Sequence, residues 1–271
     1  MGVFFYNSAF INEEDLIING SNRAFNYGDG FFETIKIVNK KPFNLSTHYA
    51  RYSFACLVLK IENSETEKSL LSIISELIKQ NKIVNGSVKV QVFRKEGGKY
   101  SPNHSSSEIL IIANKGLGFE INKPISLCIF SDEVKTKGKI SNIKSLNSLV
   151  SVLGSIYAKE FDFGGAILMN TAGNYIETTN SNIFIVKKGV IYSPPLSDGC
   201  VDGTMRNWVF SQENIIEKSL IQVDIEKADE VFTTNAITGI TSVNMVEEIG
   251  FSNFDCVTKL QKKLISLSSD L

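Results

Sequence analysis

In the first 115 residues, segments with the two-residue hydrophobic repeat of strands occur together with segments that have the three- and four-residue repeat of helices. Residues 31–38 are rich in β-branched and aromatic side chains and follow the turn-forming sequence NYGDG, so they predict a strand. Residues 87–94 and 107–115 predict two further strands, separated by a glycine-rich loop. Residues 46–61 and 65–82 have the three- and four-residue spacing of amphipathic helices.

The first of these helices has a recognisable start and a candidate core face. Ser46 is a possible N-cap, because a serine hydroxyl can accept a hydrogen bond from an N–H of the first turn. Ala50, Phe54 and Leu57 recur at helical spacing and are expected to face the core.

The second half of the chain also mixes strands and helices, but not as regular βαβ units. Strands are expected at 125–130 and 164–170 and, joined by tight turns, within 181–195 and 229–246; helices are expected at 145–161, 204–218 and 253–269. This order predicts an α+β protein with two lobes. We expect a smaller N-terminal lobe at 1–115, an irregular linker at 116–124 that carries glycines and a proline, and a larger C-terminal lobe at 125–271.

Composition and charge argue against a nucleic-acid-binding protein and against a membrane protein. The chain has 271 residues, 43% of them hydrophobic, and a formal net charge of −1, with its basic residues scattered. Such a chain can bury a sizeable core and has no electrostatic footprint for nucleic acid or an anionic membrane. It has no apolar run of membrane-spanning length, and its first residues lack a basic segment and a cleavage site, so we expect no signal peptide. Four widely spaced cysteines fit free thiols, so we expect a cytoplasmic protein.

Several common catalytic designs find no support in the sequence. There are only two histidines, His48 and His104, and neither has acidic or cysteine neighbours at metal-ligand spacing. The motifs of serine hydrolases, dinucleotide-binding folds and P-loops are also missing. An enzyme of this composition is expected to use an organic cofactor and no metal.

A few polar residues stand where a fold alone does not require them. Lys144 follows a polar turn and precedes the apolar helix pattern, without a carboxylate three or four residues later. Glu177 lies between two apolar strands, and Arg51 lies in the amphipathic helix. Gly203 opens a helix, and Asn235 follows a strand, so both regions could offer backbone N–H groups to an anion. A solvated lysine or an ordinary loop would explain each of them singly.

Together these residues occur in ordered motifs that resemble one family. The motifs are NRAFNYGDGFFET, HYARY, IKSLN, YIETTNSNIF, YSPPLSDGCVDGTMR and DEVFTTNA. Their order and spacing over nearly the whole chain resemble the class IV aminotransferases, which are pyridoxal-phosphate enzymes of fold type IV. The family includes branched-chain and D-amino-acid aminotransferases and aminodeoxychorismate lyase.

The resemblance implies a role for each of these residues. Lys144 would form the Schiff base with pyridoxal 5'-phosphate, Glu177 would keep the pyridine nitrogen protonated, and Arg51 would bind the phosphate. Backbone N–H groups of Thr204 and Met205, and those around Asn235 and Ala236, would complete the phosphate site. The cofactor would lie between two lobes, in a homodimer.

Departures from the aminotransferase pattern suggest one branch of the family. Met205 and Ala236 replace threonines that aminotransferases often have, and aminodeoxychorismate lyase is similar to this chain at both places. Thr34 matches a threonine of the lyase, and Lys99, in a glycine-rich loop, matches an arginine that would meet a substrate carboxylate. Glu33, in contrast, is similar to the D-amino-acid enzymes.

The reaction implied is pyruvate elimination from 4-amino-4-deoxychorismate, giving 4-aminobenzoate for folate biosynthesis. In that reaction Lys144 would be the base, while Thr34, Asn235 and Lys99 would hold the substrate. The alternatives are a branched-chain or D-amino-acid aminotransferase, or a non-catalytic relative that only binds the cofactor.

Overall fold

In the computed structural model, residues 2–269 are described, and they form two compact units. The first comprises residues 2–118, 143–147 and 268–269, and the second comprises 119–142 and 148–267. The chain thus leaves the first unit within the predicted linker. Residues 143–147, which we expected in the C-terminal lobe, belong to the first unit.

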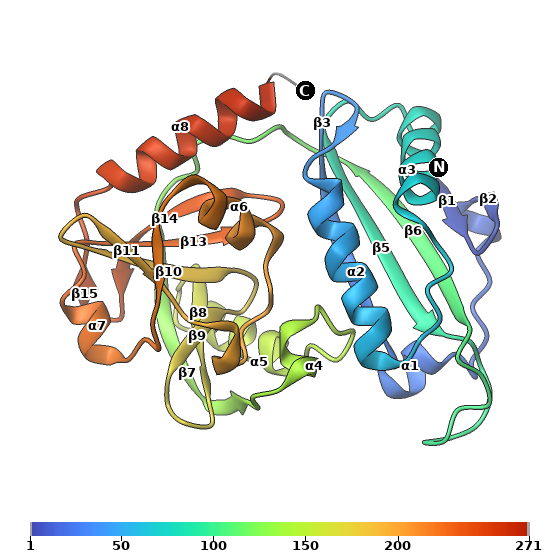
Figure 1. Ribbon diagram of the computed structural model, residues 1–271, viewed down its shortest axis with the longest axis horizontal. Helices are drawn as coiled ribbons and strands as arrows, with labels where there is room; N and C mark the ends of the chain where they lie inside the picture. Colours follow the sequence, from blue (N-terminus) through green and yellow to red (C-terminus); the bar gives the residue numbers. More distant parts are fainter. Residues whose placement is uncertain (1, 270–271) are drawn as a thin grey trace. The chain divides into compact units, whose positions relative to one another are not determined.

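The first unit is a six-stranded antiparallel sheet with helices packed on one face (Figure 1). The strand order is β2-β1-β6-β5-β3-β4. The strands are β1 (Val3–Tyr6), β2 (Ala9–Asn12), β3 (Gly30–Val38), β4 (Lys41–Pro42), β5 (Gly86–Arg94) and β6 (Ser107–Lys115). The helices are η1 (Glu13–Asp15), α1 (Arg23–Tyr27), α2 (Leu45–Leu59) and α3 (Glu67–Gln80).

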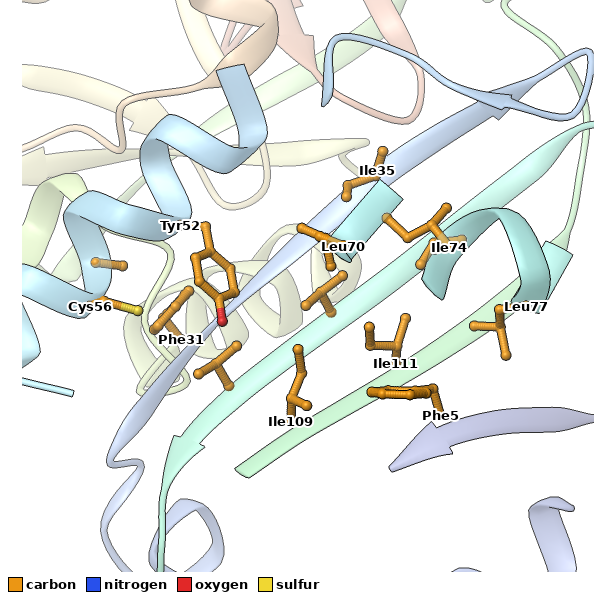
Figure 2. Close-up of a cluster of buried hydrophobic side chains, with 14 of the residues drawn as sticks. Phe5, Phe31, Ile35, Tyr52, Cys56, Leu70, Ile74, Leu77, Ile109 and Ile111 are labelled. Carbon is orange, nitrogen blue, oxygen red and sulfur yellow. The ribbon is translucent and has the colours of Figure 1, made fainter. Parts of the chain in front are cut away.

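One hydrophobic cluster joins this sheet to helices α2 and α3, and Figure 2 shows part of it. Alternate residues of the strands point to it, including Phe31 and Ile35 of β3 and Ile111 of β6. Tyr52 and Leu70 supply the helix side. Because side chains alternate along a strand, Phe32 and Thr34 must lie on the other face of the sheet.

The second unit contains a mixed sheet of nine strands. Their order is β12-β11-β10-β13-β14-β7-β8-β9, with β15 beside β14. The strands are β7 (Ile125–Lys135), β8 (Gly165–Asn170), β9 (Tyr175–Thr178), β10 (Asn182–Lys187), β11 (Val190–Ser193), β12 (Ile215–Glu217), β13 (Glu230–Asn235), β14 (Gly239–Val246) and β15 (Ile249–Gly250). The helices are α4 (Lys139–Asn142), α5 (Leu149–Glu160), η2 (Leu196–Asp198), α6 (Thr204–Gln212), α7 (Gln222–Glu226) and α8 (Asp255–Ser269). No helix within residues 2–269 has the length and apolar character needed to cross a bilayer.

The predicted core face of the first long helix is wrong. Helix α2 begins after Asn44 rather than Ser46, and it turns His48, Arg51, Tyr52, Ala55 and Cys56 inward. Ala50 is exposed, and Phe54 and Leu57 have 36% and 75% of their surface exposed. Two polar residues occupy the buried face because a buried carboxylate of β3 satisfies them, as described below.

Two other predicted helices are shorter than expected. Helix α6 ends at Gln212, and Ile215–Glu217 forms β12, which pairs in parallel with β11. Helix α5 begins at Leu149 rather than 145, because residues 144–146 are extended and pair with the edge of β3. Lys144 therefore does not lie at a helix start, and α5 is not a buried helix, since only Gly154 and Ala158 in it are buried.

Two adjacent leucines of α3 provide a matched test of the core. Leu70 is 1% exposed within the cluster, whereas Leu71 is 41% exposed. We expect Leu70→Ala to lower the free energy of unfolding by about 2–5 kcal/mol, because it leaves a cavity. Leu71→Ala should lower it by less than about 1 kcal/mol. Urea unfolding of both variants measures this, and equal losses would contradict the packing of α3.

Candidate functional site

Lys144 lies in an extended segment that adds to the edge of strand β3. Its carbonyl accepts a hydrogen bond from the Phe32 N–H at 2.9 Å, and the Leu146 N–H donates to the Gly30 carbonyl at 3.1 Å. The side chain is half-buried, and its Nζ lies 4.4 Å from the centre of the Phe32 ring. This contact places the amine beside the aromatic ring, on which a cation is favoured.

Arg51 belongs to a buried polar triad on the helix-covered face of the same strand. Its Nε donates to Oε1 of Glu33 at 2.7 Å, and its Nη2 donates to Oε2 at 2.6 Å. Nδ1 of His48 lies 2.6 Å from the same Oε2. All three side chains are buried. His48 and Arg51 are three residues apart on α2, so they lie on one face of the helix.

The charges within the triad follow from this geometry. Burial opposes ionisation of Glu33, but the charge of Arg51 and the hydrogen bonds from Arg51 and His48 outweigh it and lower the pKa of Glu33 to about 2. Burial lowers the pKa of His48, and the positive charges of Arg51 and Lys144 act in the same direction against the effect of Glu33. At neutral pH His48 is thus neutral. Because the carboxylate can only accept, Nδ1 carries the proton.

The opposite face of the sheet carries Thr34 and a cation that the sequence did not suggest. Thr34 is half-buried and directly opposite Lys89 in the β3–β5 register. The Nζ of Lys89 lies 5.0 Å from the centre of the Phe32 ring, so the ring has both Lys89 and Lys144 beside it. The alternation VKVQV in β5 was the available signal, since it puts Lys89 on the face away from the core.

Lys99 lies in a loop that is anchored by Arg23. The Nη1 of Arg23 donates to the carbonyls of Gly97, Gly98 and Lys99 at 3.1, 3.2 and 2.7 Å. Its Nε donates to Asp29 at 2.8 Å. The Lys99 side chain itself is exposed. The backbone of the loop is thereby held, while the predicted substrate lysine stays accessible.

In the second unit, Glu177 is buried on strand β9, not in a surface loop. Its Oε1 accepts a hydrogen bond from the ammonium group of Lys135, and its Oε2 accepts one from the Val201 N–H at 2.8 Å. Two donors leave further acceptor capacity on a carboxylate, which has about four lone-pair positions. Lys135 was missed because only the pairing of β7, β8 and β9 brings it close to Glu177.

Val201, whose N–H binds Glu177, lies three residues before the first residue of helix α6. The Asn182 Nδ2 donates to the Val201 carbonyl at 2.8 Å. A Cβ on Gly203 would come within 1.8 Å of the Asn182 Oδ1, so a larger residue would require the Asn182 side chain to move. Thr204 and Met205 follow as the first residues of α6, both buried.

The turn that contains Asn235 and Ala236 belongs to the same neighbourhood. Asn182 is opposite Thr234 in the β10–β13 register, and the Thr234 hydroxyl is buried without a hydrogen-bond partner among the described residues. The Asn235 Oδ1 accepts from the N–H groups of Ile237 and Thr238 at 2.9 and 2.8 Å. Its Nδ2 donates to the Ser181 hydroxyl at 3.0 Å. The Asn235 side chain thus stabilises its own turn.

The predicted site residues therefore form two groups. Lys144, Arg51, Thr34 and Lys99 belong to the first unit, while Glu177, Thr204, Met205, Asn235 and Ala236 belong to the second. Their donor set suits pyridoxal phosphate: an amine, a guanidinium, a buried carboxylate and the N-terminus of a nine-residue helix. Their individual roles stay predictions. Within residues 2–269 no three His, Cys, Asp or Glu side chains lie close enough to hold a metal ion.

The amino-acid sequence is similar to a known protein family and to several of its members. Residues 30–246 match the family model described as amino-transferase class IV. A D-alanine aminotransferase of Staphylococcus epidermidis is 26% identical over 256 residues, covering 90% of this chain and 88% of that protein. The aminodeoxychorismate lyase of Bacillus subtilis is 25% identical over 275 residues, covering 93% of this chain and 89% of that protein.

The fold is shared with solved structures. A branched-chain aminotransferase from Thermoproteus uzoniensis, crystallised with norvaline, superposes with a TM-score of 0.92 at 20% identity. The match covers 99% of this chain and 95% of that one. It confirms the predicted two-lobed α+β fold.

The triad predicts how stability depends on pH. Glu33 and His48 both have folded-state pKa values below their ordinary values of 4.5 and 6.5, so their contributions are present above those values and are lost on acidification. We expect the free energy of unfolding to fall below pH 6.5, and more steeply from pH 4.5 towards pH 2. The part due to Glu33 is roughly 3 kcal/mol. Urea unfolding across this pH range measures both losses.

Glu33→Gln separates this effect from general acid unfolding. At pH 7 it should lower the free energy of unfolding by roughly 3–5 kcal/mol, because the charge of Arg51 stays buried without its counter-ion. Below pH 4.5 its curve should be flatter than that of the wild type. Glu62→Gln, at an exposed position, is the control. A Glu33→Gln curve parallel to the wild type would contradict the assignment.

Proposed function

Since the chain belongs to the class IV aminotransferase family, whose members are pyridoxal-phosphate-dependent enzymes, we propose that it is an aminodeoxychorismate lyase. It would release pyruvate from 4-amino-4-deoxychorismate and leave 4-aminobenzoate, a precursor of folate. The observation that carries the proposal is the position of Thr34. It lies on the same sheet face as Phe32 and Lys89, and Phe32 contacts Lys144.

Cofactor binding would use both groups of site residues. Lys144 would hold the aldehyde carbon covalently, Glu177 would hold the proton of the pyridine nitrogen, and Arg51 would bind the phosphate. The N–H groups at the start of α6 and in the turn at Asn235 and Ala236 would bind the phosphate as well. When bound, pyridoxal phosphate supplies an electron sink for the carbon that carries the substrate amine.

The chain's own residues would then carry out the elimination. The Lys144 amine would take up the proton from the carbon that carries the substrate amine. The bond between the ring and the enolpyruvyl oxygen breaks, the ring becomes aromatic, and the departing enol takes a proton to become pyruvate. Thr34 would hold the substrate for this elimination, and Asn235 would be a second residue that holds it.

Charge complementarity supports this substrate class. Aminodeoxychorismate carries two carboxylates, one on the ring and one on the enolpyruvyl group. Lys89 lies opposite Thr34, and Lys99 is exposed on its anchored loop, so two cations are available beyond Lys144. An alanine-like substrate has one carboxylate and would need only one of them.

A D-amino-acid or branched-chain aminotransferase is the second candidate. It is favoured by the D-alanine aminotransferase of Staphylococcus epidermidis, which matches this chain as well as the lyase of Bacillus subtilis does. Transamination would use the same proton transfer by Lys144.

We also propose a cytoplasmic location and a homodimer. Light scattering of the purified protein can check the homodimer.

The first prediction of this proposal concerns Lys144. Purified protein loaded with pyridoxal phosphate should absorb near the visible edge, and borohydride should abolish this band and attach the cofactor to the peptide that contains Lys144. Lys144→Ala should lose both signals, while Lys137→Ala should keep them. Mass spectrometry locates the label. A label on another lysine would contradict the assignment.

The second prediction separates lyase from aminotransferase. Given aminodeoxychorismate, the enzyme should release 4-aminobenzoate faster than it transaminates any amino acid paired with 2-oxoglutarate. Thr34→Gly should slow this release by roughly tenfold or more, since losing one substrate hydrogen bond raises a barrier by about 1.4 kcal/mol. Thr47→Gly, on the helix α2, is the control. Rapid transamination without an aromatic product would refute the lyase.

A further inference from the structure

Glu33 is hydrogen-bonded to Arg51, and His48 is hydrogen-bonded to Glu33. Neither Glu33 nor His48 takes part in the chemistry proposed above. We infer that they are positioning residues, which hold the guanidinium of Arg51 in the orientation that binds the phosphate of the cofactor. The inference rests on the proposed function, in which Arg51 is the phosphate ligand.

The contacts of Glu33 fix the plane of the guanidinium. Both carboxylate oxygens accept a hydrogen bond from Arg51, one from Nε at 2.7 Å and one from Nη2 at 2.6 Å. Two parallel bonds define the plane as well as the position of the group, which a single bond does not. They use two of the five N–H donors of the arginine.

His48 in turn fixes the carboxylate. Its Nδ1 lies 2.6 Å from Oε2 of Glu33, the oxygen that also accepts from Arg51 Nη2. The carboxylate cannot rotate about its terminal bond without losing one of these contacts. The orientation therefore passes from His48 through Glu33 to Arg51, all of them buried.

Packing alone does not call for this arrangement. The neighbouring positions on the same two faces are apolar, with Phe31 and Ile35 on β3 and Tyr52 and Ala55 on α2. A buried ion pair commonly stabilises a fold no better than apolar residues of similar volume. Three charged or polar side chains at this junction thus point to a task in addition to docking α2 on the sheet.

The test has to change geometry without changing charge. Glu33→Gln is unsuitable for it, because the freed charge of Arg51 would itself attract a phosphate. Glu33→Asp keeps the charge but shortens the side chain by one methylene. His48 is neutral, so His48→Leu removes a hydrogen bond at constant charge, and His48→Asn keeps a donor near the position of Nδ1.

The experiment compares two ligands that differ only in the phosphate. Pyridoxamine 5'-phosphate and pyridoxamine are titrated into cofactor-depleted full-length protein, and the dissociation constants are measured by calorimetry. Neither ligand has an aldehyde, so the covalent bond to Lys144 does not contribute. Leu57→Ala, on the exposed side of α2, is the control.

We expect Glu33→Asp to weaken the binding of pyridoxamine 5'-phosphate by roughly ten- to a hundredfold, as for one charge-assisted hydrogen bond, and to leave pyridoxamine within about twofold. His48→Leu should weaken the phosphorylated ligand by roughly three- to tenfold, and His48→Asn should recover most of this loss. Should Glu33→Asp not fold, the two His48 variants carry the test, since both leave the Arg51–Glu33 pair in place.

Two results would overturn the inference. Equal losses for both ligands, or no loss for either, would mean that the triad only supports the fold. A failure of the proposed cofactor site looks different, because the wild-type protein would then bind neither ligand or would bind both with the same affinity. A failure of the lyase assignment alone would leave these affinities unchanged and would show only in the 4-aminobenzoate assay.

Discussion

The fold of the first unit depends on one buried carboxylate. Glu33 stands in the middle of β3, on the face covered by α2, and it is the partner that allows Arg51 and His48 to point into the protein. A cation buried without such a partner would cost several kcal/mol. The carboxylate thereby decides which side of α2 faces the sheet, and it leaves Phe54 and Leu57 outside.

Because side chains alternate along β3, its successive residues lie on opposite faces of the sheet. Phe31, Glu33 and Ile35 face the helices, and Phe32 and Thr34 face the other way. The extended segment at Lys144 pairs with the same strand, so the position of the amine is fixed by backbone hydrogen bonds rather than by a helix. One strand hence supports Arg51 on one face and presents Thr34 and the ring beside Lys144 on the other.

The sequence predicted most of the strands, because β-branched alternation and turn glycines are local signals. It predicted the family from ordered motifs, although none of them is specific alone. It failed where a distant partner decides the outcome. The inward face of α2 depends on Glu33, the extended form of 144–146 depends on the edge of β3, and the partner of Glu177 depends on the register of three strands. Lys89 and His48 were readable from strand and helix periodicity, but only once their elements were placed.

Glu33 and Glu177, two of the buried carboxylates, are each paired with a cation of their own unit. Glu33 is neutralised by Arg51, and Glu177 is paired with Lys135. Arg51 and Glu33 together carry no net charge, so an arginine in this setting offers a phosphate directed N–H groups more than it offers net attraction. Directed donors act only at the right angle and distance, whereas a net charge acts at any orientation. A binding site of this kind gains selectivity for the tetrahedral phosphate over other anions, and it depends on whatever holds the guanidinium still.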